Sequence, residues 1–356
     1  MNEQMFIKNI NLKKNNIVAR FDFNISKTDN SRIYEALPTI KYILSQNPNR
    51  LVLTTHYGRP VPGYDNSKYS VQFMANILEQ SLNNKVTFLL DPCDITDSDT
   101  GIFLLENVRF NDCETNCDVN GKYANSYFNM GNVFILDAFG CIHRDHMSIC
   151  GISKRSDLIN KKIGYGLLIA KELNNMKDII STTSTKKVLY IMGGAKTDKL
   201  KLIDKFCQNE NTTIFVGGYL ATLYNKTNSH VIIRSDGITK TGKLINTTLI
   251  DDNVLDIGPQ SIKILKKEID DADIIFWNGP LGIIEDPLYI KGTLCILNYL
   301  VETNKKIIIG GGETGSVANN MNIQSDNIFI STGGGALMQY LQKGLTLCGL
   351  VQFSID

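Results

Sequence analysis

Cationic side chains follow several apolar runs in the first half of the chain. The run 101–110, GIFLLENVRF, ends in Glu106, Asn107 and Arg109. Other runs in this half are followed by Asp22, Asn24, His56, Arg59, Asp137, His143, Arg144 and His146. Guanidinium groups bind carboxylates and phosphates through paired hydrogen bonds. The pattern predicts a site for a small, multiply anionic substrate whose hydroxyls contact Asp22 and Asn24.

In the second half, the apolar runs are followed by glycine-rich turns. These turns occupy residues 193–194, 217–218, 278–280, 310–312 and 333–335, and Lys196 follows the first of them. Glycines let backbone N–H groups approach a polyphosphate closely, and a helix N-terminus behind them favours negative charge. One such turn is a weak indication, because glycines interrupt most loops between strands and helices. Five at successive strand ends favour a nucleotide site, and the two sites together predict phosphoryl transfer.

Composition narrows the classes of protein to consider. The chain has 356 residues, 43% of them hydrophobic, and a formal net charge of +1. This charge gives no reason to expect nucleic-acid or membrane partners. The N-terminal residues lack the apolar core of a signal peptide, and no apolar run is long enough to span a bilayer. We expect a cytoplasmic protein, and the family resemblance described below implies that it acts as a monomer.

The eight cysteines are scattered and predict reduced thiols. Cys141, His143, His146 and Cys150 form one dense group that could in principle bind zinc. However, the spacing C-x-H-x2-H-x3-C is not a standard zinc pattern, and four ligands so close along one segment rarely reach a tetrahedron. We therefore favour separate roles for these residues.

Continuous apolar runs that alternate with helical stretches predict an α/β fold with parallel sheets covered on both faces. We expect two doubly wound domains joined by a helix, with a cleft and a hinge between them. Helices are predicted at residues 33–45, 71–80, 199–207 and 262–270, and the joining helix at 164–180. In such sheets, ligands bind beyond the carboxyl ends of the strands, where the residues named above lie.

The chain resembles the phosphoglycerate kinase family over nearly its whole length. The matching motifs, in the family's order, are RFDFN, SRIYEALPTIKYIL, THYGRP, LLENVRF, DAFGCIHRDHMSICG, GGAKTDK, DIGPQSI, WNGPLGIIED, IIGGGETG and STGGGALMQYL. The resemblance implies a domain at 1–165, completed by a tail at about 344–356, that binds 3-phosphoglycerate or 1,3-bisphosphoglycerate. It also implies a domain at 166–343 that binds ATP or ADP with Mg²⁺.

Carried onto this chain, the resemblance implies catalytic roles for Arg32, Lys196 and Gly311. The implied substrate-binding residues are Asp22, Asn24, Arg32, His56, Arg59, Arg109, His143 and Arg144. The implied nucleotide-binding residues are Gly194, Lys196, Lys199, Gly218, Asn278, Glu285, Gly310, Gly312, Glu313 and Thr314. Glu313 would hold the magnesium through the nucleotide.

Four departures from the family pattern lie in the second half. Glu313 stands where the family has Asp, and Lys199 follows Lys196 by three residues and not four. Tyr219 follows Gly218 where the family has a third glycine, and residues 224–256 form a much shorter region. We expect a working kinase with a trimmed nucleotide site. The alternative is a paralogue that binds phosphoglycerate as a sensor or partner-binding module.

Overall fold

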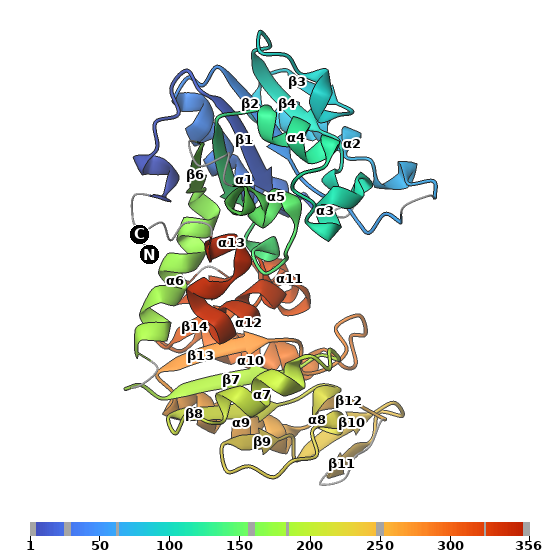
Figure 1. The fold of residues 1–356 in the computed structure, drawn as a ribbon. Coiled ribbons are helices and arrows are strands. Elements are labelled where there is room, and N and C mark those ends of the chain that lie inside the picture. Colours follow the sequence, from blue (N-terminus) through green and yellow to red (C-terminus); the bar gives the residue numbers. More distant parts are fainter. Residues whose placement is uncertain are drawn as a thin grey trace. The chain divides into compact units, whose positions relative to one another are not determined.

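The computed structural model describes residues 5–24, 30–61, 64–155, 161–182, 185–246, 253–323 and 325–351 (Figure 1). Contacts divide the chain into two compact units. The first unit comprises Met1–Asn174 and Lys343–Asp356, and the second comprises Asn175–Gln342. The division falls inside helix α6 (Leu167–Thr182).

The first unit contains a six-stranded sheet in the order β3-β4-β2-β1-β5-β6, and all neighbouring strands are parallel. Its strands are β1 (Asn16–Phe21), β2 (Arg50–Thr54), β3 (Val86–Leu89), β4 (Gly101–Leu105), β5 (Val133–Asp137) and β6 (Lys162–Tyr165). Its helices are α1 (Ser31–Ser45), α2 (Gln72–Leu82), α3 (Asp112–Asn116), α4 (Lys122–Asn129), α5 (Met147–Cys150) and α13 (Cys348–Val351).

Both faces of this sheet are buried. Successive residues of a strand point to opposite faces, so Ile17 and Ala19 pack in the cluster formed with α1 and α2. Val18 packs in a second cluster that contains Tyr127 and Phe128 of α4. The continuous apolar runs seen in the sequence follow from this double coverage.

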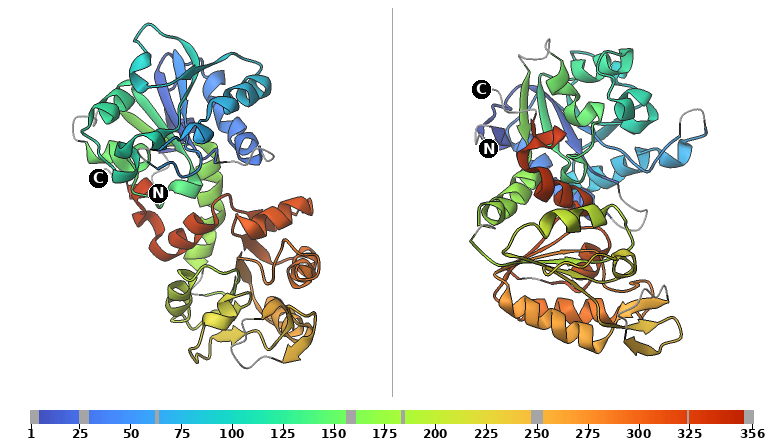
Figure 2. Two further views of the ribbon diagram at one scale, coloured as in Figure 1. Left: turned by 90° about the vertical axis from the view of Figure 1, so that its right-hand side faces the viewer. Right: turned by 60° about the horizontal axis from the view of Figure 1, so that its bottom comes forward.

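The second unit contains another six-stranded parallel sheet, in the order β15-β14-β13-β7-β8-β9 (Figure 2). Its strands are β7 (Val188–Met192), β8 (Thr212–Val216), β9 (Val231–Ile233), β13 (Ile274–Asn278), β14 (Lys306–Ile309) and β15 (Ile328–Ile330). Its helices are α7 (Lys199–Phe206), α8 (Leu220–Leu223), α9 (Pro259–Asp271), α10 (Lys291–Val301), α11 (Glu313–Asn320) and α12 (Gly334–Lys343).

The second sheet is also covered on both faces. Ile191 and Trp277 pack in the cluster that contains residues of α9, α10 and α11. On the opposite face, the ring of Tyr190 stacks on Phe206 of α7 and on Phe276 of β13. The predicted α/β class with two parallel-sheet units is thus confirmed, and the predicted helices form with ends shifted by at most three residues.

Two elements differ from the sequence-based expectation. Residues 164 and 165 belong to strand β6, so the joining helix begins only at Leu167. The sequence of β6 did not predict a strand, because the run has only four residues and contains a glycine. Pairing with β5 determines its extended conformation. The second unit also contains an unpredicted antiparallel sheet of β10 (Asp236–Thr239), β11 (Leu244–Asn246) and β12 (Val254–Ile257).

The strand orders place one switch point in each unit. A switch point lies between two neighbouring strands from which the chain continues to opposite sides of the sheet. These strands are β1 and β5 in the first sheet and β7 and β13 in the second. Loops that follow such neighbouring strands leave a crevice at the carboxyl edge, where ligands bind in this class of fold. None of the described helices is both long and apolar enough to cross a membrane.

Candidate functional site

At the switch point of the first unit, Asp22 forms the centre of a charged cluster. Arg32 Nη1, from the first turn of α1, lies 2.6 Å from Asp22 Oδ2, and His56 Nδ1 lies 3.8 Å from Asp22 Oδ1. Burial opposes ionisation of Asp22, but the charges of Arg32 and Arg20 outweigh it and hold the pKa of Asp22 at about 2. Asp22 is therefore a fixed anion that orients the arginine beside it.

His56 is neutral in this cluster. Arg20 Nη2 lies 3.3 Å from His56 Nδ1, and because a guanidinium only donates, Nδ1 must accept. The ring proton is thus on Nε2. Burial, followed by the charges of Arg20 and Arg109, holds the pKa of His56 well below its usual range, although Asp22 acts in the opposite direction. His56 can therefore donate a hydrogen bond to an anion without adding a charge.

Arg109 and Asn24 converge on one turn that follows β2. Arg109 Nη1 donates to the carbonyl oxygen of Gly58 at 2.7 Å, and Asn24 Oδ1 accepts from the Gly58 N–H at 2.9 Å. Gly58 has a φ of +62°, a conformation that side chains rarely adopt. The turn thus links the ends of three strands, β1, β2 and β4, while the neighbouring Arg59 is exposed.

Several buried polar atoms in this cluster lack a hydrogen-bond partner among the described residues. They are Arg109 Nε and Nη2, Arg144 Nε and His143 Nδ1. Burial and the charge of Arg144 lower the pKa of Arg109 to about 10 and that of His143 to about 4. Unpaired buried donors cost free energy, and neighbouring cations repel one another. The arrangement fits a carboxylate or phosphate that receives these hydrogen bonds.

Three other polar residues at the strand ends have structural roles. Glu106 accepts hydrogen bonds from Ser70 and from the N–H of Val71, and Asn107 Nδ2 donates to two loop carbonyls. Asp137 accepts from the N–H of Ile169 at 2.9 Å, at the start of α6. Of the polar residues in the run 101–110, Arg109 is thus the one available to a ligand.

Sequence reasoning missed Arg20 and Glu114, two buried residues that contact members of this cluster. Arg20 Nε donates to Ser148 Oγ at 2.8 Å, and Arg20 Nη2 lies 3.7 Å from Glu114 Oε1. Glu114 Oε1 also lies 3.3 Å from His146 Nδ1. Arg20 occupies a strand interior, where a long cation is unusual, and that anomaly was the available signal.

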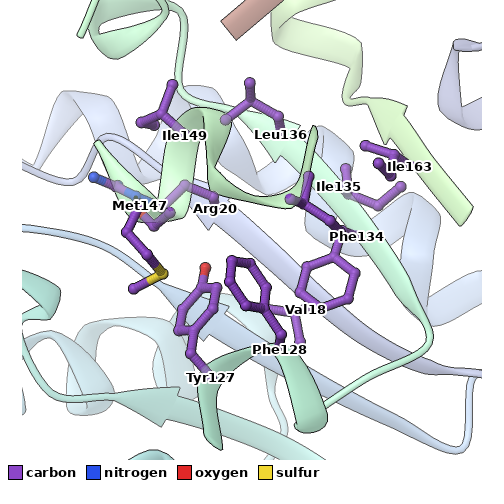
Figure 3. Close-up of a pocket in the computed structure, with 12 residues that line it drawn as sticks. Val18, Arg20, Tyr127, Phe128, Phe134, Ile135, Leu136, Met147, Ile149 and Ile163 are labelled. Atoms are coloured by element: carbon purple, nitrogen blue, oxygen red, sulfur yellow. Dashed lines mark hydrogen bonds between the residues drawn. The ribbon is translucent and has the colours of Figure 1, made fainter. Parts of the chain in front are cut away.

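A cavity of about 20 Å³ lies against Arg20 in the interior of the first unit. Figure 3 shows the rings of Tyr127, Phe128 and Phe134 grouped along one side of it. A volume of this size accommodates roughly one water molecule. The cavity is therefore part of the packing behind the cluster and is too small to bind a substrate.

The zinc arrangement considered from the sequence does not form. Cys141 lies with Asp22 and His56 in one group of possible ligands, whereas Cys150 lies with Cys117 and Asp145 in another. The two cysteines therefore belong to different environments within the described part of the chain.

In the second unit, the loops after β7 and β13 pack directly on each other. Lys199 is only 7% exposed, and its Nζ donates to the carbonyl oxygens of Gly193 and Asn278 at 2.9 and 3.1 Å. Burial and the nearby Lys196 lower the pKa of Lys199 to about 8, although Glu313 acts in the opposite direction. Gly279 has a φ of +95°, and a Cβ there would lie 2.2 Å from the Gly193 oxygen.

The loop after β14 leads into the N-terminus of α11. A Cβ at Gly310 would lie 2.3 Å from Asn278 Nδ2, and one at Gly311 would lie 2.3 Å from the Ser331 carbonyl oxygen. Gly312 has a φ of +84° and precedes Glu313, the first residue of the helix. Thr314 is buried, and its Oγ1 has no hydrogen-bond partner among the described residues. Close backbone packing, an available hydroxyl and a helix N-terminus together make an anion site.

The remaining predicted nucleotide residues lie around these loops. Gly194 and Gly218 both have positive φ, and a Cβ on Gly218 would lie 2.7 Å from the Gly194 nitrogen. Lys196 is exposed just before α7, and Glu285 is exposed between β13 and α10. Tyr219, the residue after Gly218, is 43% exposed. Among the described residues of 224–258 there is no helix, and the small antiparallel sheet occupies this region instead.

These features define a class: an α/β protein of two parallel-sheet units, one with a cationic site and the other with a glycine-lined site at the strand ends. Comparison with known proteins is more specific. The family model for phosphoglycerate kinase matches residues 7–248 and 235–344. The phosphoglycerate kinase of Eremothecium gossypii is 31% identical over 409 residues, and the alignment covers 96% of both chains. That of Hypocrea rufa is 32% identical, with 99% of both chains covered.

Solved structures show the same fold. Phosphoglycerate kinase from Coxiella burnetii superposes with a TM-score of 0.78 at 24% identity, and 98% of each chain is covered. The enzyme from Pyrococcus horikoshii gives the same TM-score at 20% identity. This chain belongs to the phosphoglycerate kinase family, and its relatives are named for a phosphotransferase activity.

Proposed function

We propose that this chain transfers a phosphoryl group reversibly between 1,3-bisphosphoglycerate and ADP, giving 3-phosphoglycerate and ATP. In this reaction the bond between phosphorus and the carboxyl oxygen breaks, and a β-phosphate oxygen of ADP bonds to the phosphorus. The observation that carries the proposal is the set of buried, unpaired donors on Arg109 and Arg144, with the unpaired Nδ1 of His143 beside them. They match a small substrate with several negative charges.

In this proposal the first unit binds the phosphoglycerate. Arg109 and Arg144 hold its terminal phosphate, together with His56, His143 and the exposed Arg59. Asp22 and Asn24 contact the hydroxyl and carboxylate region. Arg32 is held by Asp22 at 2.6 Å and remains 32% exposed, so part of its guanidinium can stabilise the charge of the transferring group.

The second unit binds the nucleotide in this proposal. The N-terminus of α11, with Gly311 and Thr314, receives phosphate oxygens, and Lys196 reaches the transferring phosphoryl group as a movable cation. Gly194, Gly218, Asn278 and the neighbouring loops shape the wall of the site. Catalysis then depends on positioning and charge neutralisation, without a covalent intermediate. Turnover requires the two units to bring their bound substrates together and exclude water.

The donors near α11 fit magnesium bound with the nucleotide. Glu313 is an exposed carboxylate in the first turn of α11, next to the proposed phosphate site. Mg²⁺ in phosphate sites commonly takes one or two carboxylates, phosphate oxygens and water. When bound, the ion supplies charge neutralisation on the phosphate oxygens. Glu313 would hold it, and its extra methylene relative to aspartate loosens the fit.

A coupled assay of phosphoryl transfer from ATP to 3-phosphoglycerate, repeated with GTP, tests the proposal. Turnover with either nucleotide supports a kinase, and the ratio measures base selection in the altered second unit. Absence of turnover with both nucleotides would refute it. Calorimetry with 3-phosphoglycerate then tests the alternative of a binding module, which the exposed Tyr219 and the substituted Glu313 favour. We further propose that the enzyme is monomeric and cytoplasmic, as in the initial expectation.

A further inference from the structure

Three thiols in the first unit converge from separate segments of the chain. Cys117 follows α3, Cys150 ends α5, and Cys348 begins α13 in the returning C-terminal segment. The Cys117 and Cys150 sulfurs are 4.0 Å apart. Cys348 Sγ donates to the carbonyl oxygen of Arg144 at 3.0 Å, and the same oxygen lies 4.0 Å from the Cys150 sulfur. None of these residues contributes to the charged cluster around Asp22.

A carboxylate completes the group. Asp145 Oδ1 lies 2.7 Å from the Cys150 sulfur, and the possible ligand atoms of Cys117, Asp145 and Cys150 all lie within 4.8 Å of one another. In a tetrahedral zinc site with Zn–S distances of about 2.3 Å, two sulfurs are about 3.8 Å apart. The Cys117–Cys150 separation is therefore close to that of two zinc-bound thiolates.

A cation already contacts two of these atoms. Lys154 Nζ lies 3.3 Å from the Cys117 sulfur and 2.5 Å from Asp145 Oδ1. The side chains of Lys154 and Asp145 are 41% and 62% exposed, so the ammonium can move into solvent and leave a path to the thiols. Its position shows that the group attracts positive charge, and a metal ion would compete with it for the same atoms.

We propose that Cys117, Asp145 and Cys150 form a three-residue zinc site in the first unit, at the place where the two thiols and the carboxylate converge. Soft thiolates with one carboxylate suit Zn²⁺. Binding requires the thiols to release their protons and Lys154 to withdraw. Because zinc binds thiolates and not thiols, affinity for zinc increases with pH.

The test uses the full chain, reduced with a phosphine and stripped of metal by a chelator. We expect one zinc ion per chain in a competition titration, and cobalt should give the visible spectrum of a tetrahedral thiolate site. Cys117→Ser and Cys150→Ser should each weaken zinc binding by more than about 100-fold, a larger loss than that from residues that only orient metal ligands. Zinc should also raise the melting temperature of the wild-type protein.

Matched variants separate the proposed site from nonspecific thiol binding. Cys93→Ser and Cys295→Ser remove thiols outside the group and should leave zinc affinity unchanged. Cys348→Ser removes a nearby thiol that bonds to the Arg144 carbonyl oxygen and should also leave zinc affinity unchanged. Lys154→Met should tighten binding several-fold, because it removes the competing ammonium.

Asp145→Asn should also weaken zinc binding. Because the substitution keeps the size of an exposed side chain, unfolding would not explain that loss. Failure to bind zinc under reducing conditions would overturn the proposal. So would equal loss of affinity in the Cys93 and Cys117 variants, or formation of a Cys117–Cys150 disulfide that zinc does not prevent. None of these measurements depends on kinase activity, so they are independent of the proposed function.

Discussion

The two units place their candidate sites at equivalent positions but build them differently. In the first unit the groups that would contact a ligand are side chains, with charges that Asp22 and Glu114 keep in place. In the second unit, the site is mainly backbone, shaped by glycines at which a Cβ would lie 2.2–2.7 Å from a neighbouring loop. A site built from charged side chains tolerates variation in backbone shape, whereas a site built from backbone groups depends on that shape. The departures from the family pattern thus fall in the unit whose site depends on backbone shape.

The largest expected effect is that of Arg32→Ala, which removes a charge from the side-chain site. We expect turnover to fall by about 10³-fold or more, as for loss of an arginine that acts on a transferring phosphoryl group. Because Arg32 is 32% exposed, the melting temperature should change little. Lys41→Ala, an exposed cation on the same helix, is the control. Turnover near that of the wild type would remove Arg32 from the catalytic group.

The two lysines of the second unit should behave differently from each other. Lys196→Ala should lower kcat by about 10²–10³-fold with little loss of stability, because the side chain is exposed. Lys199→Met should cost about 1–3 kcal/mol of unfolding free energy, because it leaves two loop carbonyls without their donor. Enzyme kinetics and urea unfolding give kcat and the unfolding free energy of each variant, with Lys201→Ala as the control for an exposed lysine. Identical profiles for the two variants would contradict this distinction.

A smaller effect is expected when Glu313, in the glycine-lined site of the second unit, is replaced by the family's aspartate. Glu313→Asp shortens the carboxylate at the start of α11 and should lower the KM for Mg-nucleotide a few-fold. The KM for 3-phosphoglycerate should not change, because Glu313 lies in the other unit. Glu302→Asp, on an exposed surface of the second unit, is the matched control. A higher KM for the nucleotide would show that the longer side chain suits this site.

The smallest effects concern the pH dependence of stability in the first unit. The pKa of His143 is about 4, below its ordinary 6.5, so its contribution is present above pH 6.5 and is lost as the pH falls toward 4. Burial raises the pKa of Asp137 to about 6, which gives the opposite sign: its contribution is lost as the pH rises from about 4 to 6.

Urea midpoints at pH 7 and pH 4.5 separate these two contributions. His143→Gln should reduce the loss of stability on acidification. Asp137→Asn should increase that loss, because the opposing contribution disappears. If both variants showed the wild-type difference between the two pH values, neither group would control the acid response.

The sequence determined much of the fold. Its uninterrupted apolar runs encode strands that are buried on both faces, and such strands require helices above and below them. The polar residues that follow these runs then lie at one edge of each sheet, since parallel strands end on the same side. The family resemblance extended this reasoning to individual residues such as Arg32 and Lys196.

Tertiary structure decided what sequence position alone could not. Whether a polar residue after a strand serves a ligand or a neighbouring loop depends on partners far along the chain: Asn107 donates to Tyr57, while Arg109 keeps unpaired donors. The position of Arg20 inside a strand was unusual, but its role became clear only from its contacts with His56 and Glu114. The grouping of Cys117 with Cys150 likewise arises from folding, because 33 residues separate them in sequence and only the packing of the segments that carry them brings their sulfurs to 4.0 Å.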